Sequence, residues 1–119
     1  MIEYVRFTEC NEWEGETWHF YIPLISDLIP KLEQIKTILA LPGFKEMCGD
    51  EFRLRADPIS EKKVMAVVNE QSDDCDYMHK HNLVKDIKLP DTIDMTDMEA
   101  LHDIFYKGDC WVRDMNAYP

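Results

Sequence analysis

Residues 71–82, QSDDCDYMHKHN, hold three Asp, one Cys and two of the four His of the chain, side chains that can bind a metal ion. If the segment is extended, His79 and His81 project to the same side, whereas in a helix Cys75 and His79 would lie one turn apart. Zinc needs three or four such ligands, and no Cys-x2-Cys or His-Glu-x2-His spacing supplies the others. Cys75, Asp76, His79 and His81 are therefore weak metal candidates. We predict no cofactor, and a solvated acidic loop is the simpler interpretation.

Motifs of common enzyme sites do not occur in the sequence. The chain has no glycine-rich phosphate loop, no nucleophile elbow and only four Gly. The pairs Cys75/His79 and Cys110/His102 offer a thiol and a base, but sequence separation shows neither an oriented base nor an oxyanion hole. We therefore predict that the protein is not an enzyme. A metal-dependent or thiol enzyme centred on Cys75, His79 and His81 is the alternative.

The chain is strongly acidic. Its 119 residues include 24 Asp and Glu against 13 Lys and Arg, which gives a formal net charge of −11. Such a charge repels nucleic acids and anionic membranes and favours basic partners. We therefore predict a basic protein as partner, with no direct binding of nucleic acid and no binding to membranes.

Five of the acids are spaced along residues 89–103, a stretch without Lys or Arg. They are Asp91, Asp94, Asp97, Glu99 and Asp103. Proteins that mimic nucleic acids use such rows of carboxylates, because these compete for Lys and Arg side chains that otherwise bind phosphates. We predict that the five acids bind the partner. The alternative is that they cap a helix and keep the protein soluble.

A second acidic segment surrounds an aromatic residue. Trp13 has Glu12, Glu14 and Glu16 as close neighbours in the sequence. An exposed aromatic side chain within a charged rim is typical of the centre of a protein interface. We predict that these four residues also bind the partner. Alternatively, the indole packs back onto its own hairpin.

In size and charge the chain is similar to small acidic inhibitors, namely anti-CRISPR and antirestriction proteins of phages and immunity proteins that neutralise nuclease toxins. The similarity is one of composition and not of motif. It implies a binding protein, monomeric or homodimeric, that inhibits a nuclease or another nucleic-acid-binding enzyme. A structural or assembly module of a larger complex is a further alternative.

The cysteines and the apolar runs indicate the compartment. The four Cys lie far apart and match no small secreted scaffold, which favours reduced thiols; they are Cys10, Cys48, Cys75 and Cys110. No apolar run approaches the roughly 18 residues of a membrane span. Residues 1–10 alternate like a strand and do not resemble a leader. We therefore predict a cytoplasmic protein.

Hydrophobic periodicity predicts the elements that must position these residues. Strands are predicted at residues 2–8, 17–22, 52–57, 64–68, 83–89 and 110–113. One helix is predicted at residues 27–41, and a second begins within residues 94–99 and stops at Gly108. The first two strands form a hairpin. The 64–68 strand is the most buried, because VMAVV is apolar throughout, and the 83–89 strand lies at an edge. Thr96 and Glu99 form a capping box for the second helix.

This order of elements lacks the regular strand–helix alternation of a parallel sheet. It predicts an α+β fold, with a mainly antiparallel sheet of about four to six strands and two helices packed on one face. At this length, residues 1–119 are predicted to form a single domain, with residues 115–119 as a loose tail.

Overall fold

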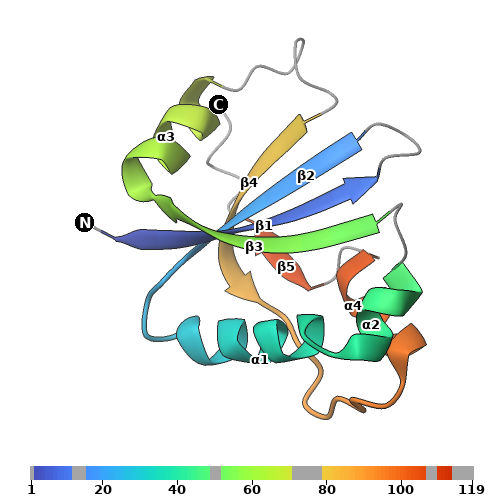
Figure 1. Cartoon of the computed structure of the whole chain (residues 1–119). Helices are drawn as coiled ribbons and strands as arrows, with labels where there is room; N and C mark the ends of the chain where they lie inside the picture. The colour runs from blue at the N-terminus through green and yellow to red at the C-terminus, as the bar shows by residue number, and fades with distance from the viewer. Residues whose placement is uncertain (1, 12–15, 49–51, 71–78, 107–109, 114–119) are drawn as a thin grey trace.

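The computed structural model describes residues 2–11, 16–48, 52–70, 79–106 and 110–113. These residues form five strands and four helices (Figure 1). In chain order they are β1 (Glu3–Asn11), β2 (Glu16–Pro23), α1 (Ile29–Leu39), α2 (Pro42–Cys48), β3 (Phe52–Ser60), α3 (Glu61–Glu70), β4 (His79–Ile87), α4 (Met98–Tyr106) and β5 (Trp111–Arg113). The strand order is β3-β1-β2-β4-β5, and all neighbours are antiparallel except β2 and β4. The predicted α+β class and mainly antiparallel sheet are confirmed.

The predicted hairpin is formed by β1 and β2. Alternation along the two strands directs Phe7, Phe20 and Ile22 into the main core, where each is at most 2% exposed. Tyr4 and Tyr21 lie on the opposite face of the sheet, in a smaller apolar cluster. The sheet therefore carries packed side chains on both faces.

The helix predicted at residues 27–41 is present as α1, which is two residues shorter at each end. Its buried side chains recur at helical spacing and are Leu32, Ile35 and Ile38. Pro30 lies in the first turn, where its missing N–H costs no hydrogen bond. One face of α1 is thus buried in the main core.

The short helix α2 was not predicted. Pro42, the residue after the predicted end of the first helix, is the first residue of α2, a position that suits its fixed φ angle. Phe44 of α2 is 2% exposed and packs edge-on against Phe105 of α4, with ring centroids 5.6 Å apart. The contact joins α2 and α4 over the main core.

The predicted strand at residues 64–68 is wrong, because these residues belong to the helix α3. Val64 and Val68, one helical turn apart, are 0% and 2% exposed and pack against Tyr4 and Tyr21. Ala66 between them is exposed. A short apolar run has no period of its own, so the pattern could not distinguish a helix from a strand here.

The edges of the sheet also differ from the prediction. β3 continues through Pro58 to Ser60, which is possible because β3 pairs only with β1 and its other side needs no N–H donor. β4, predicted as an edge strand, lies between β2 and β5. The edge strands are therefore β3 and β5.

Helices cover both faces of the sheet, which corrects the prediction of two helices on one face. α1, α2 and α4 lie on one face and α3 on the other (Figure 1). The connection from β2 to β3 crosses β1 and contains α1 and α2, whereas the return from β3 to β4 crosses β1 and β2 and contains α3. Connections between parallel strands are nearly always right-handed, so two connections that run in opposite directions must use opposite faces.

The N-cap of α4 is Asp97 and not Thr96. The Asp97 carboxylate accepts a hydrogen bond from the backbone N–H of Ala100 at 3.1 Å. Thr96 donates instead to Asp94 Oδ1, from its backbone N–H at 2.9 Å and from its hydroxyl at 2.6 Å. The predicted capping box of Thr96 and Glu99 is therefore wrong.

The last predicted strand is present as β5, which pairs with β4. Trp111 is 5% exposed and stacks on Phe20, with ring centroids 5.0 Å apart and an interplanar angle of 17°. Its ring also lies 5.5 Å from that of Phe7. These contacts fix β5 to the main core. The predicted tail at residues 115–119 lies outside the described residues.

Candidate functional site

The five acids in the C-terminal half that are predicted to bind a partner lie on one segment next to the main core. We call them the acidic segment: Asp91, Asp94, Asp97, Glu99 and Asp103. The first four are exposed, and the fifth is partly buried. Leu101 and Phe105 are at most 1% exposed, so α4, which carries the last two of the acids, is anchored in the main core. The structure therefore fixes Glu99 and Asp103 to the main core, and the other three acids lie in the residues that lead into α4.

Two carboxylates of the acidic segment also stabilise local structure. Asp97 caps α4, and the hydrogen bonds from Thr96 hold the pKa of the Asp94 carboxyl below its usual value. Each of these hydrogen bonds uses Oδ1 only. Within the described residues, no Lys or Arg forms an ion pair with Asp91, Asp94, Asp97 or Glu99. These four carboxylates thus present negative charge that no described Lys or Arg neutralises.

The contact predicted around the hairpin loop stays a prediction. Glu12, Trp13 and Glu14 lie outside the described residues. Glu16 is the first residue of β2, where its backbone pairs in register with Asn11. The structure therefore fixes where the loop begins and ends on the sheet.

Three of the four histidines meet on the face of the sheet opposite α1. His19 of β2 stacks between His79 and His81 of β4, with ring centroids 5.9 and 4.8 Å apart and interplanar angles of 12° and 9°. Tyr21 continues the stack, 5.9 Å from His81. We call these four rings the imidazole ladder. It forms because β2 and β4 are parallel, with His81 opposite His19 in register.

Polar groups hold the imidazole ladder in place. His81 Nδ1 lies 2.7 Å from the Tyr21 hydroxyl, and His19 Nδ1 lies 3.1 Å from the Thr8 hydroxyl. The side-chain amide of Asn82, which is 4% exposed, donates to the backbone carbonyl of His19 at 3.1 Å. The ladder is therefore part of what joins β2 to β4. The prediction that the two β4 histidines project to the same side when extended is confirmed.

The imidazole ladder does not have the geometry of a metal site. The in-plane lone pairs of nearly parallel rings run side by side, whereas ligands must converge on one ion at about 2.0–2.1 Å. No group of three or more His, Cys, Asp or Glu placed to hold a metal ion occurs within the described residues. Of the weak metal candidates, His79 and His81 belong to the ladder, and Cys75 and Asp76 lie outside the described residues.

Burial makes two potential nucleophiles less reactive. It raises the pKa of the Cys110 thiol to about 12, so the thiolate that would attack a substrate is scarce near neutral pH. Burial also raises the pKa of the Tyr21 phenol, and the nearby Arg6 only partly opposes this effect. The candidate pair Cys110/His102 therefore has no activated thiol.

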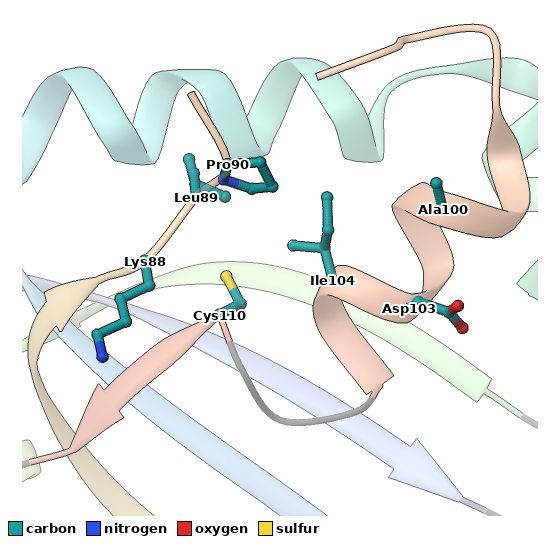
Figure 2. Close-up of a pocket in the computed structure, with 7 residues that line it drawn as sticks. All are labelled: Lys88, Leu89, Pro90, Ala100, Asp103, Ile104 and Cys110. Atoms are coloured by element: carbon teal, nitrogen blue, oxygen red, sulfur yellow. The ribbon is translucent and has the colours of Figure 1, made fainter. Parts of the chain in front are cut away.

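A hollow of about 420 Å³ adjoins the acidic segment, between α4 and the residues after β4 (Figure 2). Leu89, Pro90 and Ile104 surround the sulfur of Cys110 and make the centre of the hollow apolar. The charged ends of Lys88 and Asp103 lie on opposite sides and point away from that centre (Figure 2). The hollow can therefore take an apolar side chain better than a charged ligand.

A carboxyl group that the sequence did not single out, that of Glu9, lies opposite Trp18 in the register of β1 and β2. Burial raises the pKa of Glu9 to about 7, and the positive charge of Arg113 only partly opposes the shift. The guanidinium of Arg113 lies over Trp18, 4.9 Å from the ring centroid. Alternation along β1 puts Glu9 on the same face as Phe7, so its inward position could have been read from the strand pattern.

No protein-family model, curated protein or solved structure matches this chain. Among the described residues, no helix is both long enough and apolar enough to cross a membrane.

Proposed function

We propose that the protein is a non-enzymatic binding protein whose acidic segment binds a basic surface of a partner protein. One observation carries the proposal: within the described residues, Asp91, Asp94, Asp97 and Glu99 are exposed and have no Lys or Arg counter-ion. Such a surface attracts basic groups, which speeds encounter and orients the partner. The apolar hollow beside it would receive an uncharged side chain of the same partner.

The partner we propose is an enzyme that binds nucleic acid, such as a nuclease, and the effect of binding is inhibition. Lys and Arg side chains that bind phosphates also bind carboxylates, often in paired hydrogen bonds. The formal charge of −11 makes direct binding of nucleic acid by this chain unfavourable. A cytoplasmic location belongs to the same proposal and is supported by the free thiols of Cys10 and Cys110.

The test uses two double variants with the same change in net charge. Asp91→Lys with Glu99→Lys reverses two exposed carboxylates that make no hydrogen bond or ion pair within the described residues. Glu3→Lys with Glu61→Lys is the control, because both residues line a separate hollow at the start of β1. Asp97 is left unchanged, since its reversal would remove the cap of α4.

Each tagged protein captures partners from a nuclease-treated bacterial lysate at low and moderate salt, and mass spectrometry identifies them. We expect the parent protein and the control variant to retain one basic nucleic-acid-binding enzyme at both salt concentrations, and to inhibit it in vitro. The acidic-segment variant should lose both capture and inhibition. Equal capture by the two variants, or no specific partner, would refute the proposal.

A further inference from the structure

The walls of the apolar hollow beside α4 are held in place by the fold. Leu101 and Phe105 are at most 1% exposed and anchor α4 in the main core. On the other wall, the backbone N–H of Lys88 donates to the carbonyl of Cys110 at 2.8 Å, which ties the residues after β4 to the residue before β5. A preformed hollow needs little ordering when a side chain enters it, so more of the contact energy is left for binding.

One face of α4 supplies the helical wall of the hollow. Ala100, Asp103 and Ile104 are three and four residues apart, so they share this face. Ala100 is exposed and has the smallest side chain of the three, which leaves the hollow open on this side. The volume of about 420 Å³ falls within the range of pockets that bind ligands, and the hollow can hold a large apolar side chain.

The rim of the hollow carries more negative than positive charge. Asp91 and Glu99 are exposed, and each is next in the sequence to a residue that lines the hollow. Asp103 lines it directly, with His102 Nδ1 3.8 Å from its carboxylate. Among the described residues that line the hollow, the basic one is Lys88. A ligand that fits this rim therefore brings positive charge next to its apolar part.

This charge distinguishes between the possible occupants of the hollow. A second copy of the chain would bring the same carboxylates together, and each copy has a formal charge of −11. Anionic lipids are repelled for the same reason. The neighbouring Lys31 does not reverse the sign, because it pairs with Asp86 at 2.6 Å. A basic protein segment with an apolar side chain matches both the hollow and its rim.

Building on the proposed function, we propose that the hollow holds one large apolar side chain of the basic partner, on a segment that has Lys or Arg as the neighbours of this side chain. The basic groups face Asp91 and Glu99, while the apolar side chain lies against Leu89 and Ile104. Salt weakens the first contact more than the second. The carboxylates thus speed encounter, and the hollow slows dissociation.

The test uses three capped synthetic peptides, KKFKK, KKSKK and EEFEE, titrated into the protein at low salt and followed by NMR. The first two have equal charge and differ in the apolar side chain, and the third keeps the Phe and reverses the charge. Burial of the ring should make KKFKK bind about tenfold more tightly than KKSKK. EEFEE should bind more weakly than both. Ring-current shifts of the Ala100 and Ile104 methyl groups locate the Phe in the hollow.

A matched pair of variants tests the hollow itself. Ala100→Phe fills it from α4 and should reduce the affinity for KKFKK to that for KKSKK. Ala66→Phe is the control, because Ala66 is also exposed on a helix but lies on α3, on the other face of the sheet. This variant should bind KKFKK like the parent. Both positions are exposed, so neither substitution should unfold the protein, and urea unfolding checks this.

The outcomes separate this inference from the proposed function. If KKFKK and KKSKK bind equally, and Asp91→Lys with Glu99→Lys weakens both, the carboxylates bind basic segments without the hollow. The inference then fails and the proposed function stands. Equal binding of KKFKK and EEFEE, equal effects of Ala100→Phe and Ala66→Phe, or no measurable binding of KKFKK would also overturn the inference. The proposed function is judged by partner capture, which does not depend on these peptides.

Discussion

Asp97 Oδ1 accepts a hydrogen bond from the backbone N–H of Ala100 at 3.1 Å, so an acid of the proposed binding surface is also the N-cap of α4. Asp94 has a similar double role, because it binds Thr96 in the turn before the helix. Folding and binding are therefore linked in the acidic segment. Substitutions must be chosen so that loss of binding is not mistaken for loss of structure.

The cap gives the first prediction. Asp97→Ala should lower the free energy of unfolding by about 1 kcal/mol, because the N–H of Ala100 loses its acceptor. Asp97→Asn should cost much less, since Asn also caps helices well. Urea unfolding of both variants measures the difference. Asp91→Ala is the matched control and should change stability by no more than roughly 0.5 kcal/mol. Equal effects of Asp97→Ala and Asp91→Ala would contradict the role of Asp97.

Glu9 gives a prediction about pH. Burial raises its folded-state pKa from 4.5 to about 7, so its contribution to stability is present below about pH 4.5 and is lost as the pH rises through about 7. Glu9→Gln removes the cost of a partly buried charge. At about pH 8 it should raise the free energy of unfolding by roughly 1 to 2 kcal/mol, after allowance for solvent screening.

The measurement for Glu9→Gln is chemical unfolding at about pH 8 and pH 4. At the lower pH the native carboxyl is already neutral in the fold, so the variant and the parent should be close in stability. A stability gain of the same size at both values would show that the effect does not come from titration of Glu9. A stability loss at about pH 8 would show that attraction to Arg113 outweighs burial.

The helix α3 gives a prediction about packing. Val64 lies on the buried face of α3 and is 0% exposed. Val64→Ala should therefore lower the free energy of unfolding by about 2–3 kcal/mol through lost burial and a residual cavity. Val67 lies on a partly exposed side of the same helix, and Val67→Ala should cost less than about 1 kcal/mol. Thermal or urea unfolding compares them. Similar losses would contradict the face of α3 that the structure shows.

Elements with a clear hydrophobic period could be predicted from the sequence. The alternation of β1 and β2 gave the hairpin, and the repeat of Leu32, Ile35 and Ile38 gave α1. The α3 run has no such period, and its assignment depends on packing against Tyr4 and Tyr21, which lie on the face of the sheet that α3 covers. Since α3 was expected to be a strand, the crossover that brings β4 beside β2 was also missed.

The acidic segment and the imidazole ladder also differ in how far the sequence alone could predict them. The acidic segment lies in one stretch of sequence, so its composition was visible, whereas the hydrogen bonds of Asp94 and Asp97 were not. The imidazole ladder combines β2 with β4, and the sequence indicated only that His79 and His81 share a side. Placing His19 between them requires the parallel pairing of those strands, which depends on contacts distant in the sequence.

Thiol chemistry gives the last prediction. Cys110 is 1% exposed and burial raises its pKa to about 12, whereas Cys10 is partly exposed at the sheet surface. Iodoacetamide at about pH 8, with alkylation followed by peptide mass spectrometry, should modify native Cys110 at least about 100-fold more slowly than the same residue in urea. Cys10 serves as the internal control and should differ much less between the two conditions. Rapid alkylation of native Cys110 would restore a reactive thiol beside the apolar hollow and so favour an enzyme that uses the pair Cys110/His102, whereas protection leaves the acidic segment as the surface to test first.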